Sequence, residues 1–354
     1  MRSFSKPGDE TMKASHSSAI RGILIVFLLA TFAMAGDSGY HLLKTYKLGG
    51  EGGWDYLTLD SASRHLYISR GTHVMVIDAD SGDPVGDIPD TVGVHGIALA
   101  PELSRGFTSN GREGMVTIFD LNSLKPIAKV KVGDNPDAIV YDSVTKRVLT
   151  FNGRSQDSSV IDAAKGTVLG TIPLGGKPEF AVSDESGEVF VNIEDKSELV
   201  ALNPAKMEIN KRWPLAPCES PSGLSIDRKN RRLFVGCENK LMAIVDADTG
   251  KVLTTLPIGR GVDATKFDPE TGLAFASCGE GVLTLIHEDS PDKFSVLENV
   301  PTQAGARTMA VDGKTHNAVL VTAQFGPMPA PTADQPRQRP PMVPDSFVVL
   351  VFGK

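Results

Sequence analysis

A short motif recurs along the chain at an almost constant spacing. It is a run of β-branched and other apolar residues that ends in Asp or another polar residue, followed by a turn and a second run. The last residues of these runs stand 41 to 43 positions apart: Asp78, Asp120, Asp162, Asn203, Asp246 and His287. One small sheet cannot bury its faces without neighbours, so this period with four short strands per repeat is typical of β-propeller blades. The alternative is an irregular β-sandwich in which all five of these intervals agree by coincidence.

A second recurring position gives the number of blades. An Asp, replaced once by Ala, closes the first strand of every repeat: Asp60, Ala100, Asp142, Asp184, Asp227, Asp268 and Asp312. Each is followed by a turn and a strand-like run such as 147–152 (RVLTFN). The fold class predicted is therefore all-β: a seven-bladed β-propeller with four antiparallel strands per blade.

The seventh repeat lacks an outer strand at its own end of the sequence. The chain stops after 346–353 (SFVVLVFG), whereas 42–49 (LLKTYKLG) matches the outer-strand sequence 252–259 (VLTTLPIG) position for position. We therefore expect the N-terminal segment to complete the last blade and close the ring, which removes the open strand edges of a linear stack.

Two sequence features resemble those of a known propeller family. The unit of apolar run, Asp and turn occurs at 74–82 (VMVIDADSG), and degenerate forms of a V-Y-V-T-N strand occur at 106–110 (GFTSN) and 148–152 (VLTFN). The chain is similar in these features to the YVTN-repeat (YncE-like) β-propellers over residues 36–354. The resemblance implies the propeller fold and says little about function, because the motif consists of strand and turn residues.

The first 35 residues have the pattern of a secretory signal peptide. Lys13 and Arg21 precede an apolar run at 22–35 (GILIVFLLATFAMA) that ends in small residues. The run is shorter than the roughly 20 apolar residues that span a bilayer. We expect cleavage near Ala35, a periplasmic or secreted mature chain of residues 36–354 that forms one domain, and no membrane span.

The charge balance bears on the partners of the protein. The chain has 36 Lys and Arg against 43 Asp and Glu and a formal net charge of −7 at pH 7, which argues against a nucleic-acid-binding face. Motifs for haem attachment, a serine nucleophile elbow, a zinc protease helix or a phosphate loop do not occur in it. We expect a monomer that binds a small polar ligand or a protein partner.

A proline-rich segment, residues 323–345, interrupts the seventh repeat between its second and third strands. Such a stretch is expected not to pair in a sheet and to favour polyproline II or disorder. It is either a solvated excursion or a loop that docks a partner.

The position five residues before each strand-closing anchor is polar in all seven repeats. Because the first strand of a blade lies nearest the axis, we expect these side chains to converge at the mouth of the axial channel, where they can bind a polar ligand, a metal ion or water. They are Asp55, His95, Asp137, Glu179, Ser222, Asp263 and Arg307, called the axial ring below.

Two parts of the axial ring predict different chemistry. Arg307 stands between Asp263 and Asp55 in ring order, so these three are expected to pair with one another. His95, Asp137 and Glu179 follow on consecutive blades with no cation among them. Crowded carboxylates either have raised pKa values or hold a cation, and Ca²⁺ or Zn²⁺ would suit this set.

A rim is expected around the axial ring, in the loops between second and third strands. The tripeptides Asn110-Gly111-Arg112 and Asn152-Gly153-Arg154 occur on adjacent blades. Asn-Gly is a tight-turn signal, whereas the two arginines could together hold a carboxylate or phosphate. Later blades extend the rim with Asn192, Glu194, Asp195 and Glu238.

Three cysteines follow the predicted signal peptide. Cys218 and Cys237 belong to the same blade and are expected near the same face, so we predict a disulfide between them. Cys278 occupies the position of Cys237 one blade later, too far away for a bridge, and is expected to remain a buried thiol.

The leading functional hypothesis is an exported binding or interaction propeller that presents its channel mouth and proline-rich loop to a ligand or partner. The alternative is a metal-dependent, lactonase-like hydrolase in which Asp137, Glu179 and Asn152 imitate a lactonase metal site. A third reading, a subunit or chaperone of a periplasmic redox system, rests on compartment and architecture alone.

Overall fold

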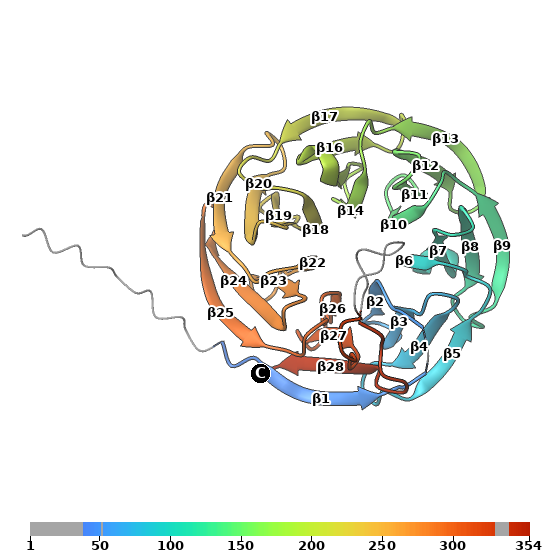
Figure 1. Cartoon of the computed structure of the whole chain (residues 1–354). Helices are drawn as coiled ribbons and strands as arrows, with labels where there is room; N and C mark the ends of the chain where they lie inside the picture. The colour runs from blue at the N-terminus through green and yellow to red at the C-terminus, as the bar shows by residue number, and fades with distance from the viewer. Residues whose placement is uncertain (1–37, 51, 330–339) are drawn as a thin grey trace, which may run out of the picture. The chain divides into compact units, whose positions relative to one another are not determined.

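The chain folds into seven four-stranded antiparallel sheets arranged around one axis (Figure 1). The computed structural model describes residues 38–50, 52–329 and 340–354. The compact unit that contains the sheets is Ala35–Lys354. The predicted all-β, seven-bladed propeller is confirmed. The predicted signal peptide lies outside the described residues and stays a prediction. Within the described part, no helix is long and apolar enough to cross a membrane.

The first four blades follow one another in the sequence. Blade one is β2 (Leu57–Asp60), β3 (His65–Ser69), β4 (Val74–Asp78) and β5 (Pro84–Ile88). Blade two is β6 (Val94–Ala100), β7 (Arg105–Asn110), β8 (Met115–Asp120) and β9 (Pro126–Lys131), with the 3₁₀ turn η1 (Pro101–Leu103). Blade three is β10 (Pro136–Asp142), β11 (Arg147–Asn152), β12 (Asp157–Asp162) and β13 (Thr167–Pro173). Blade four is β14 (Pro178–Ser183), β15 (Val189–Ile193), β16 (Glu198–Asn203) and β17 (Glu208–Pro214), with η2 (Glu194–Lys196).

The last three blades end with the one that combines both ends of the fold. Blade five is β18 (Pro221–Asp227), β19 (Arg232–Cys237), β20 (Leu241–Asp246) and β21 (Val252–Pro257). Blade six is β22 (Val262–Asp268), β23 (Leu273–Cys278), β24 (Val282–Ser290) and β25 (Lys293–Pro301). Blade seven is β26 (Met309–Val311), β27 (Ala318–Thr322), β28 (Val348–Gly353) and β1 (His41–Lys47). The repeat anchor His287 lies inside β24, because this strand continues into a longer hairpin with β25.

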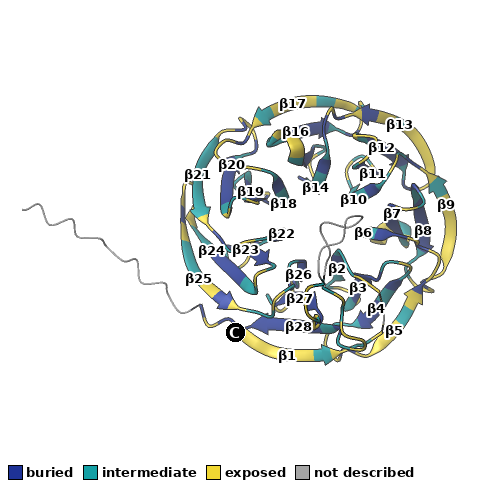
Figure 2. Ribbon diagram, in the orientation of Figure 1, coloured by how far each residue is buried: buried dark blue, intermediate teal, exposed yellow. Residues whose placement is uncertain are grey.

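The innermost strands carry the contacts that close the circle. Each inner strand packs against the inner strands of its two neighbours, and β2 of blade one meets both β6 of blade two and β26 of blade seven. The middle strands are buried on both faces, as in β23 and β27, whereas the outer strands β1 and β9 are largely exposed (Figure 2). Burial of both faces of a sheet requires a neighbour on each side, which a closed ring supplies to every blade.

The recurring Asp at the end of the first strand has two structural tasks. It accepts backbone hydrogen bonds from the turn that follows, as Asp227 does from the Lys229 N–H at 2.9 Å. In four blades it also accepts a hydrogen bond from the next blade: Ser183 Oγ to Asp142 (2.7 Å), Arg231 to Asp184 (2.7 Å), His316 Nδ1 to Asp268 (2.9 Å) and Ser61 Oγ to Asp312 (2.8 Å). The residue that marks the repeat in the sequence therefore also joins neighbouring blades.

Strand β1 closes the ring as the sequence predicts. It pairs antiparallel with β28 from His41↔Gly353 to Lys47↔Val348, with one irregularity between Leu42 and Lys44. Tyr46 then seals the seam between blades seven and one. Its hydroxyl donates to the carbonyl of Asp80 at 2.8 Å, and its ring covers Gly82, where a Cβ would lie 2.4 Å from Tyr46 Cγ. The positive φ of +79° at Gly82 requires glycine as well.

The described ends of the proline-rich segment form an isolated bridge outside the sheets. Its described ends pair with each other beside blade seven: Gly326 N–H donates to the Pro341 carbonyl at 2.8 Å, and Val343 N–H donates to the Gln324 carbonyl at 2.8 Å. The bridge between Phe325 and Met342 is isolated and belongs to none of the sheets, so the described residues do not contradict the prediction that the segment does not pair in a sheet. Pairing is possible because both donors are non-proline residues, which keep their N–H groups.

The seam between the last and first blades yields a test of ring closure. Replacing Tyr46 by Ala should lower the free energy of unfolding by roughly 2 kcal/mol, because a packed aromatic ring and its hydrogen bond are lost. Replacing Leu42, exposed on the same strand, by Ala should change it by less than about 0.5 kcal/mol. Urea denaturation of both variants measures the difference. Equal effects would contradict the role given to Tyr46.

Candidate functional site

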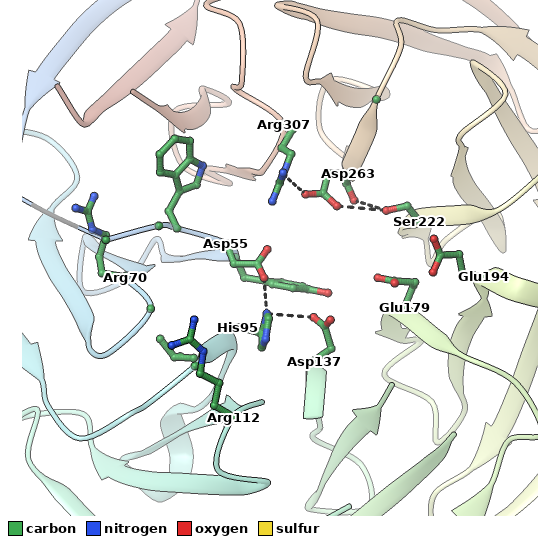
Figure 3. A pocket seen from close by; sticks show the side chains of 18 of the residues that line it. Asp55, Arg70, His95, Arg112, Asp137, Glu179, Glu194, Ser222, Asp263 and Arg307 are labelled. Atoms are coloured by element: carbon green, nitrogen blue, oxygen red, sulfur yellow. Dashed lines mark hydrogen bonds and ion pairs between the residues drawn. The ribbon is translucent and has the colours of Figure 1, made fainter. Parts of the chain in front are cut away.

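A cavity of about 950 Å³ lies at the axis of the propeller. All seven residues of the axial ring line this cavity (Figure 3). The structure therefore brings together the residues that were chosen by their common position in the repeat. That they bind a ligand stays a prediction. The convergence follows from the fold, because each residue stands at or just before the start of an inner strand. The cavity is further lined by Trp54, Tyr56, Arg70, Arg112, Glu194 and Glu238.

Two aromatic rings meet across the axis one residue deeper than the axial ring. Tyr56 of blade one stacks on Phe180 of blade four, with ring centroids 4.5 Å apart and planes at 24°. Blades one and four are not neighbours, so the stacked pair spans the channel beneath the polar side chains. The Tyr56 hydroxyl oxygen is buried and has no hydrogen-bond partner among the described residues. The pair forms a floor, which turns the channel mouth into a cup.

His95 lies between two carboxylates in the cup. Its Nδ1 is 2.6 Å from Asp55 Oδ2 and 3.7 Å from Asp137 Oδ1. The predicted pairing of Asp55 with Arg307 is therefore wrong, because the carboxylate of Asp55 lies against His95 instead. Arg307 instead contacts Asp263, with Nε 2.7 Å from Oδ2, as the sequence predicts for this half of the trio.

The position of the His95 ring depends on the glycine of the first Asn-Gly-Arg tripeptide. A Cβ at Gly111 would lie 2.7 Å from His95 Nε2, so only glycine leaves room for the imidazole. With Nε2 against this backbone, Nδ1 is the nitrogen that faces Asp55 and Asp137. Gly111 is thus part of the site, although the sequence motif indicates only a turn.

Glu179 has a cationic partner that the sequence analysis missed. Lys177 Nζ lies 2.5 Å from Glu179 Oε1 and also contacts Glu194. The expectation that His95, Asp137 and Glu179 share no cation is therefore wrong. A signal was present, because alternate residues of an extended chain point to the same side, and Lys177 stands two positions before Glu179.

The candidate metal ligands change accordingly. The donor atoms of Asp55, His95 and Asp137 all lie within 4.8 Å of one another. Glu179 is not part of this group, and Asp55 takes its place. The replacement of Glu179 by Asp55 in the ligand set could not be predicted from the sequence, because it depends on the directions of the side chains within the cup.

Burial and crowding shift the pKa values in the cup. Burial lowers the pKa of His95, but the hydrogen bond to Asp55 and the charge of Asp137 outweigh it and raise the pKa to about 9. Burial, with the other ring carboxylates, raises the pKa of Asp137. Burial and the charge of Asp137 raise the pKa of Glu179 against the opposing effect of Lys177. The carboxylates of the cup are thus held in an environment that favours an added positive charge.

The rim residues divide into two groups. Arg112, Glu194 and Glu238 line the cavity, whereas Arg154 and Asp195 do not, so the predicted grip by two arginines is wrong. Asn110 and Asn152 are buried and bonded within their own blades. The side-chain amide of Asn110 donates to Thr117 Oγ1 at 2.8 Å, that of Asn152 to Asp157 Oδ1 at 2.6 Å, and that of Asn192 to the Ser222 carbonyl at 2.8 Å. These amides hold strands and loops rather than face the cavity.

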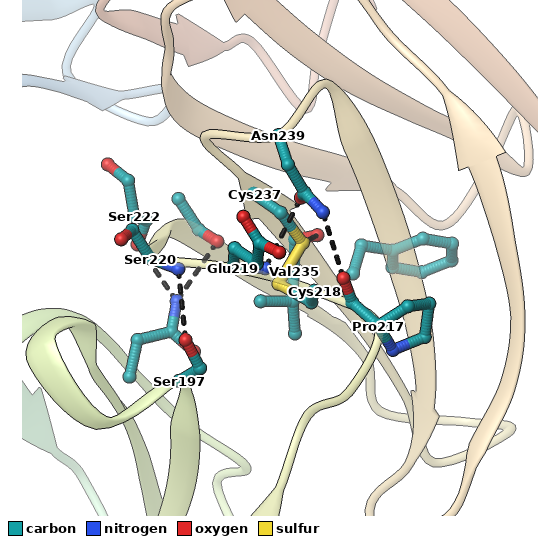
Figure 4. Close-up of a disulfide and its surroundings, with 12 residues drawn as sticks. Ser197, Pro217, Cys218, Glu219, Ser220, Ser222, Val235, Cys237 and Asn239 are labelled. Carbon is teal, nitrogen blue, oxygen red and sulfur yellow. Dashed lines mark hydrogen bonds between the residues drawn. A yellow bond between two sulfur atoms is a disulfide. The ribbon is translucent and has the colours of Figure 1, made fainter.

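A disulfide fixes the loop that enters blade five. Cys218 and Cys237 are joined, with Cα atoms 5.4 Å apart (Figure 4). The loop is tied further by the Asn239 side chain, which accepts from Glu219 N–H at 3.2 Å and donates to the Pro217 carbonyl at 2.8 Å. Ser220 and Ser222, which follow directly, line the cavity. Cys278 is a buried free thiol, and burial raises its pKa to about 12.

The aromatic floor also escaped the sequence analysis, although the repeat contains a signal for it. Tyr56 and Phe180 occupy the same repeat position, where the other five blades have small residues: Gly96, Ala138, Gly223, Ala264 and Thr308. At Gly223 a Cβ would lie 2.6 Å from the Thr265 nitrogen of the next blade. Two aromatic residues at a repeat position that is otherwise occupied by small residues indicate side chains that extend away from their own strands and across the channel.

Comparisons with known proteins support the fold more than the function. No protein-family model matches the chain. Dihydro-heme d1 dehydrogenase of Pseudomonas aeruginosa is 28% identical over 101 residues, which are 28% of this chain and 20% of that protein. The probable U3 small nucleolar RNA-associated protein 18 of Schizosaccharomyces pombe is 24% identical over 208 residues, 55% of this chain and 40% of that protein. The chain thus spans less than half the length of both curated relatives.

A solved structure shares the architecture. Hydrazine synthase of Kuenenia stuttgartiensis superimposes with a TM-score of 0.66 at 15% sequence identity, covering 76% of this chain and 92% of that chain. At this identity the likeness is one of fold alone. The fold and the cavity together define a seven-bladed β-propeller with a charged cup at its axis.

The crowding in the cup predicts how stability depends on pH. The folded-state pKa of His95 lies above its ordinary value of about 6.5, so its contribution is complete below that pH and is lost as pH rises toward about 9. The raised pKa values of Asp137 and Glu179 act in the same direction, but their contributions begin to be lost at lower pH, as pH rises above the ordinary pKa of a carboxyl group. Urea unfolding in EDTA should therefore show stability falling over this range. In a His95→Gln/Asp137→Asn variant the free energy of unfolding should fall less steeply with pH. An unchanged slope would contradict the raised pKa values of these two residues.

The disulfide yields a separate stability prediction. Replacing Cys218 and Cys237 together by Ala should lower the free energy of unfolding by about 2–4 kcal/mol, because the unfolded chain is no longer constrained. Dithiothreitol should lower the melting temperature of the wild type and leave that of the double variant unchanged. Equal sensitivity of both proteins to the reductant would show that the bridge does not contribute.

Proposed function

We propose that the protein is an exported binding propeller that takes a small polar ligand in its axial cup. The observation that carries this proposal is a single cavity to which all seven blades contribute a polar side chain. Its volume of about 950 Å³ lies within the usual range for small-molecule sites, about 300–1,000 Å³. Export rests on the signal-peptide pattern.

The charges that line the cup suggest the chemistry of the ligand. Most are already engaged: Asp263 with Arg307, Asp55 with His95, and Glu179 with Lys177. Arg112 and Glu238 line the cavity without an ion-pair partner among residues 38–50, 52–329 and 340–354. A ligand with an anionic group could pair with Arg112, and a hydroxyl or amino group of the same ligand could donate a hydrogen bond to Glu238. Small polar metabolites of this kind are the class we propose.

A protein partner is a further element of the proposal. The proline-rich segment 323–345 begins beside the cup, since Phe325 at its base contacts Trp54 with ring centroids 5.9 Å apart. Its placement next to a cavity-lining residue suits a loop that presents the cup to a partner.

A second candidate function is a metal-dependent hydrolase of the lactonase kind. The observation that favours it is the group Asp55, His95 and Asp137, whose donor atoms lie within 4.8 Å. The ligand set predicted from the sequence is not retained, because Asn152 is buried and bonded to Asp157 and Glu179 is paired with Lys177. A metal there would polarise a carbonyl and lower the pKa of bound water.

Tryptophan fluorescence provides a direct test of ligand binding. The chain has two tryptophans: Trp54 lines the cavity, and Trp213 lies on the outer strand β17. In a Trp213→Phe variant, at least one member of a panel of amino acids, hydroxy acids and sugar acids should change the Trp54 emission saturably. The Trp54→Phe variant should give no response.

A matched pair of arginines controls this test. Arg112→Ala should weaken the binding of the responding ligand about tenfold or more, because a charged hydrogen bond is lost. Arg154→Ala removes the equivalent side chain of the next blade, which does not line the cavity, and should leave binding unchanged. No saturable response to any member of the panel, or equal effects of the two variants, would contradict the proposed binding mode.

A further inference from the structure

We propose that Asp55, His95 and Asp137 form a binding site for one divalent transition-metal ion, with Zn²⁺ as the best-fitting species. The inference rests on the proposed function in one respect: it assigns part of the polar cup to a metal rather than to an organic ligand. It also replaces the earlier choice between Ca²⁺ and Zn²⁺ by a defined set of three donors.

The distances within the group suit a small cation. His95 Nδ1 lies 2.6 Å from Asp55 Oδ2 and 3.7 Å from Asp137 Oδ1. Ligands about 2.0–2.2 Å from a tetrahedral Zn²⁺ are themselves roughly 3.3–3.5 Å apart. Shifts of less than about 1 Å would bring these two contacts to that spacing, and the donor oxygens of Asp55 and Asp137 lie within 4.8 Å of each other. Both carboxylate side chains are about one-fifth exposed, at 23% and 20%, so an entry path exists.

The donor types select the metal. An imidazole nitrogen with two carboxylates suits Zn²⁺ and its transition-metal neighbours, whereas Ca²⁺ takes six to eight oxygen ligands. Three protein donors at the wall of an open cavity leave a fourth position free, the pattern of zinc sites that bind water or substrate. Gly111 holds His95 with Nδ1 toward the carboxylates and Nε2 against the backbone. Close packing against Gly111 thus orients the imidazole before any metal arrives.

The hydroxyl of Tyr56 provides a second, independent observation beside the three donors. The buried Tyr56 hydroxyl, on the residue next to Asp55, lacks a hydrogen-bond partner in the described part of the chain. A buried hydroxyl without a partner is costly. Water bound at the free position of a metal in the same cup would supply a partner, which the three protein ligands do not.

The other two carboxylates of the axial ring are already paired with cations. Lys177 pairs with Glu179 and contacts Glu194, and Arg307 pairs with Asp263. Asp55 and Asp137 have only His95 as a cationic neighbour in the ion pairs of the described residues. The charge that a divalent ion would balance is therefore concentrated on the three proposed ligands.

Calorimetric titration with Zn²⁺ tests the site. The purified protein is first dialysed against EDTA and then against metal-free buffer. The wild type should bind one equivalent, and His95→Asn and Asp137→Asn should each weaken binding about 100-fold or abolish it. Glu179→Gln and Asp263→Asn remove neighbouring carboxylates of the same cup and should retain one equivalent. Circular dichroism and melting curves check that all variants are folded.

Cobalt gives a readout that depends on the ligands themselves. Co²⁺ should produce a visible d–d absorption band in the wild type and in Glu179→Gln, and no such band in His95→Asn. A hundredfold excess of Ca²⁺ should leave the band unchanged. Absence of Zn²⁺ binding in the wild type would overturn the proposal. So would binding that survives in His95→Asn, since the ion would then occupy another surface site.

The two proposals can fail separately. A metabolite response of Trp54 in metal-free protein, together with no Zn²⁺ binding, would retain the binding function and remove the metal site. One equivalent of Zn²⁺ bound through His95, with no metabolite response in the Zn²⁺-loaded protein, would retain the metal site and remove the proposed ligand class.

Discussion

The pairing of β1 with β28 is the interaction on which the rest of the structure depends. A four-stranded blade cannot bury both faces alone, and a row of seven blades would still leave two faces and a strand edge open. Hydrogen bonds from His41↔Gly353 to Lys47↔Val348 remove that edge by joining the two ends of the fold in one sheet. Once the ring is closed, every inner strand has a fixed place beside the axis. The seven axial-ring residues then converge without any local motif that would bring them together.

Convergence at the axis also creates an electrostatic problem that the molecule solves locally. Four carboxylates of the axial ring share one cavity, and burial makes their charges costly. Arg307 and Lys177 neutralise two of them by direct contact. His95 contacts the other two, Asp55 and Asp137, and their negative charges raise its pKa to about 9. The concentration of uncompensated charge on Asp55 and Asp137 connects the fold to the proposed metal site.

The fold could be predicted almost entirely from the sequence, because a propeller is recognised by the regular spacing of its repeats rather than by particular side chains. The spacing of the Asp anchors gave the number of blades, and the match between 42–49 and 252–259 gave the ring closure. The same register selected the axial ring, since its members lie at one repeat position. Partners within the ring could not be predicted. Asp55 reaches His95 rather than Arg307, and Lys177 reaches Glu179 from outside the selected position. These choices depend on side-chain directions in three dimensions, as does the stacking of Tyr56 on Phe180 across the axis.

The central claim is that one side chain from each blade meets in a single cup, with a metal-binding face formed by blades one, two and three. Diffraction from crystals grown with one equivalent of Zn²⁺, recorded on both sides of the zinc absorption edge, tests it most directly. The account predicts one strong anomalous peak inside the axial ring, bounded by Asp55, His95 and Asp137, with Glu179 still on Lys177. Peaks confined to exposed histidines such as His41, or an axial ring that is dispersed rather than convergent, would contradict it.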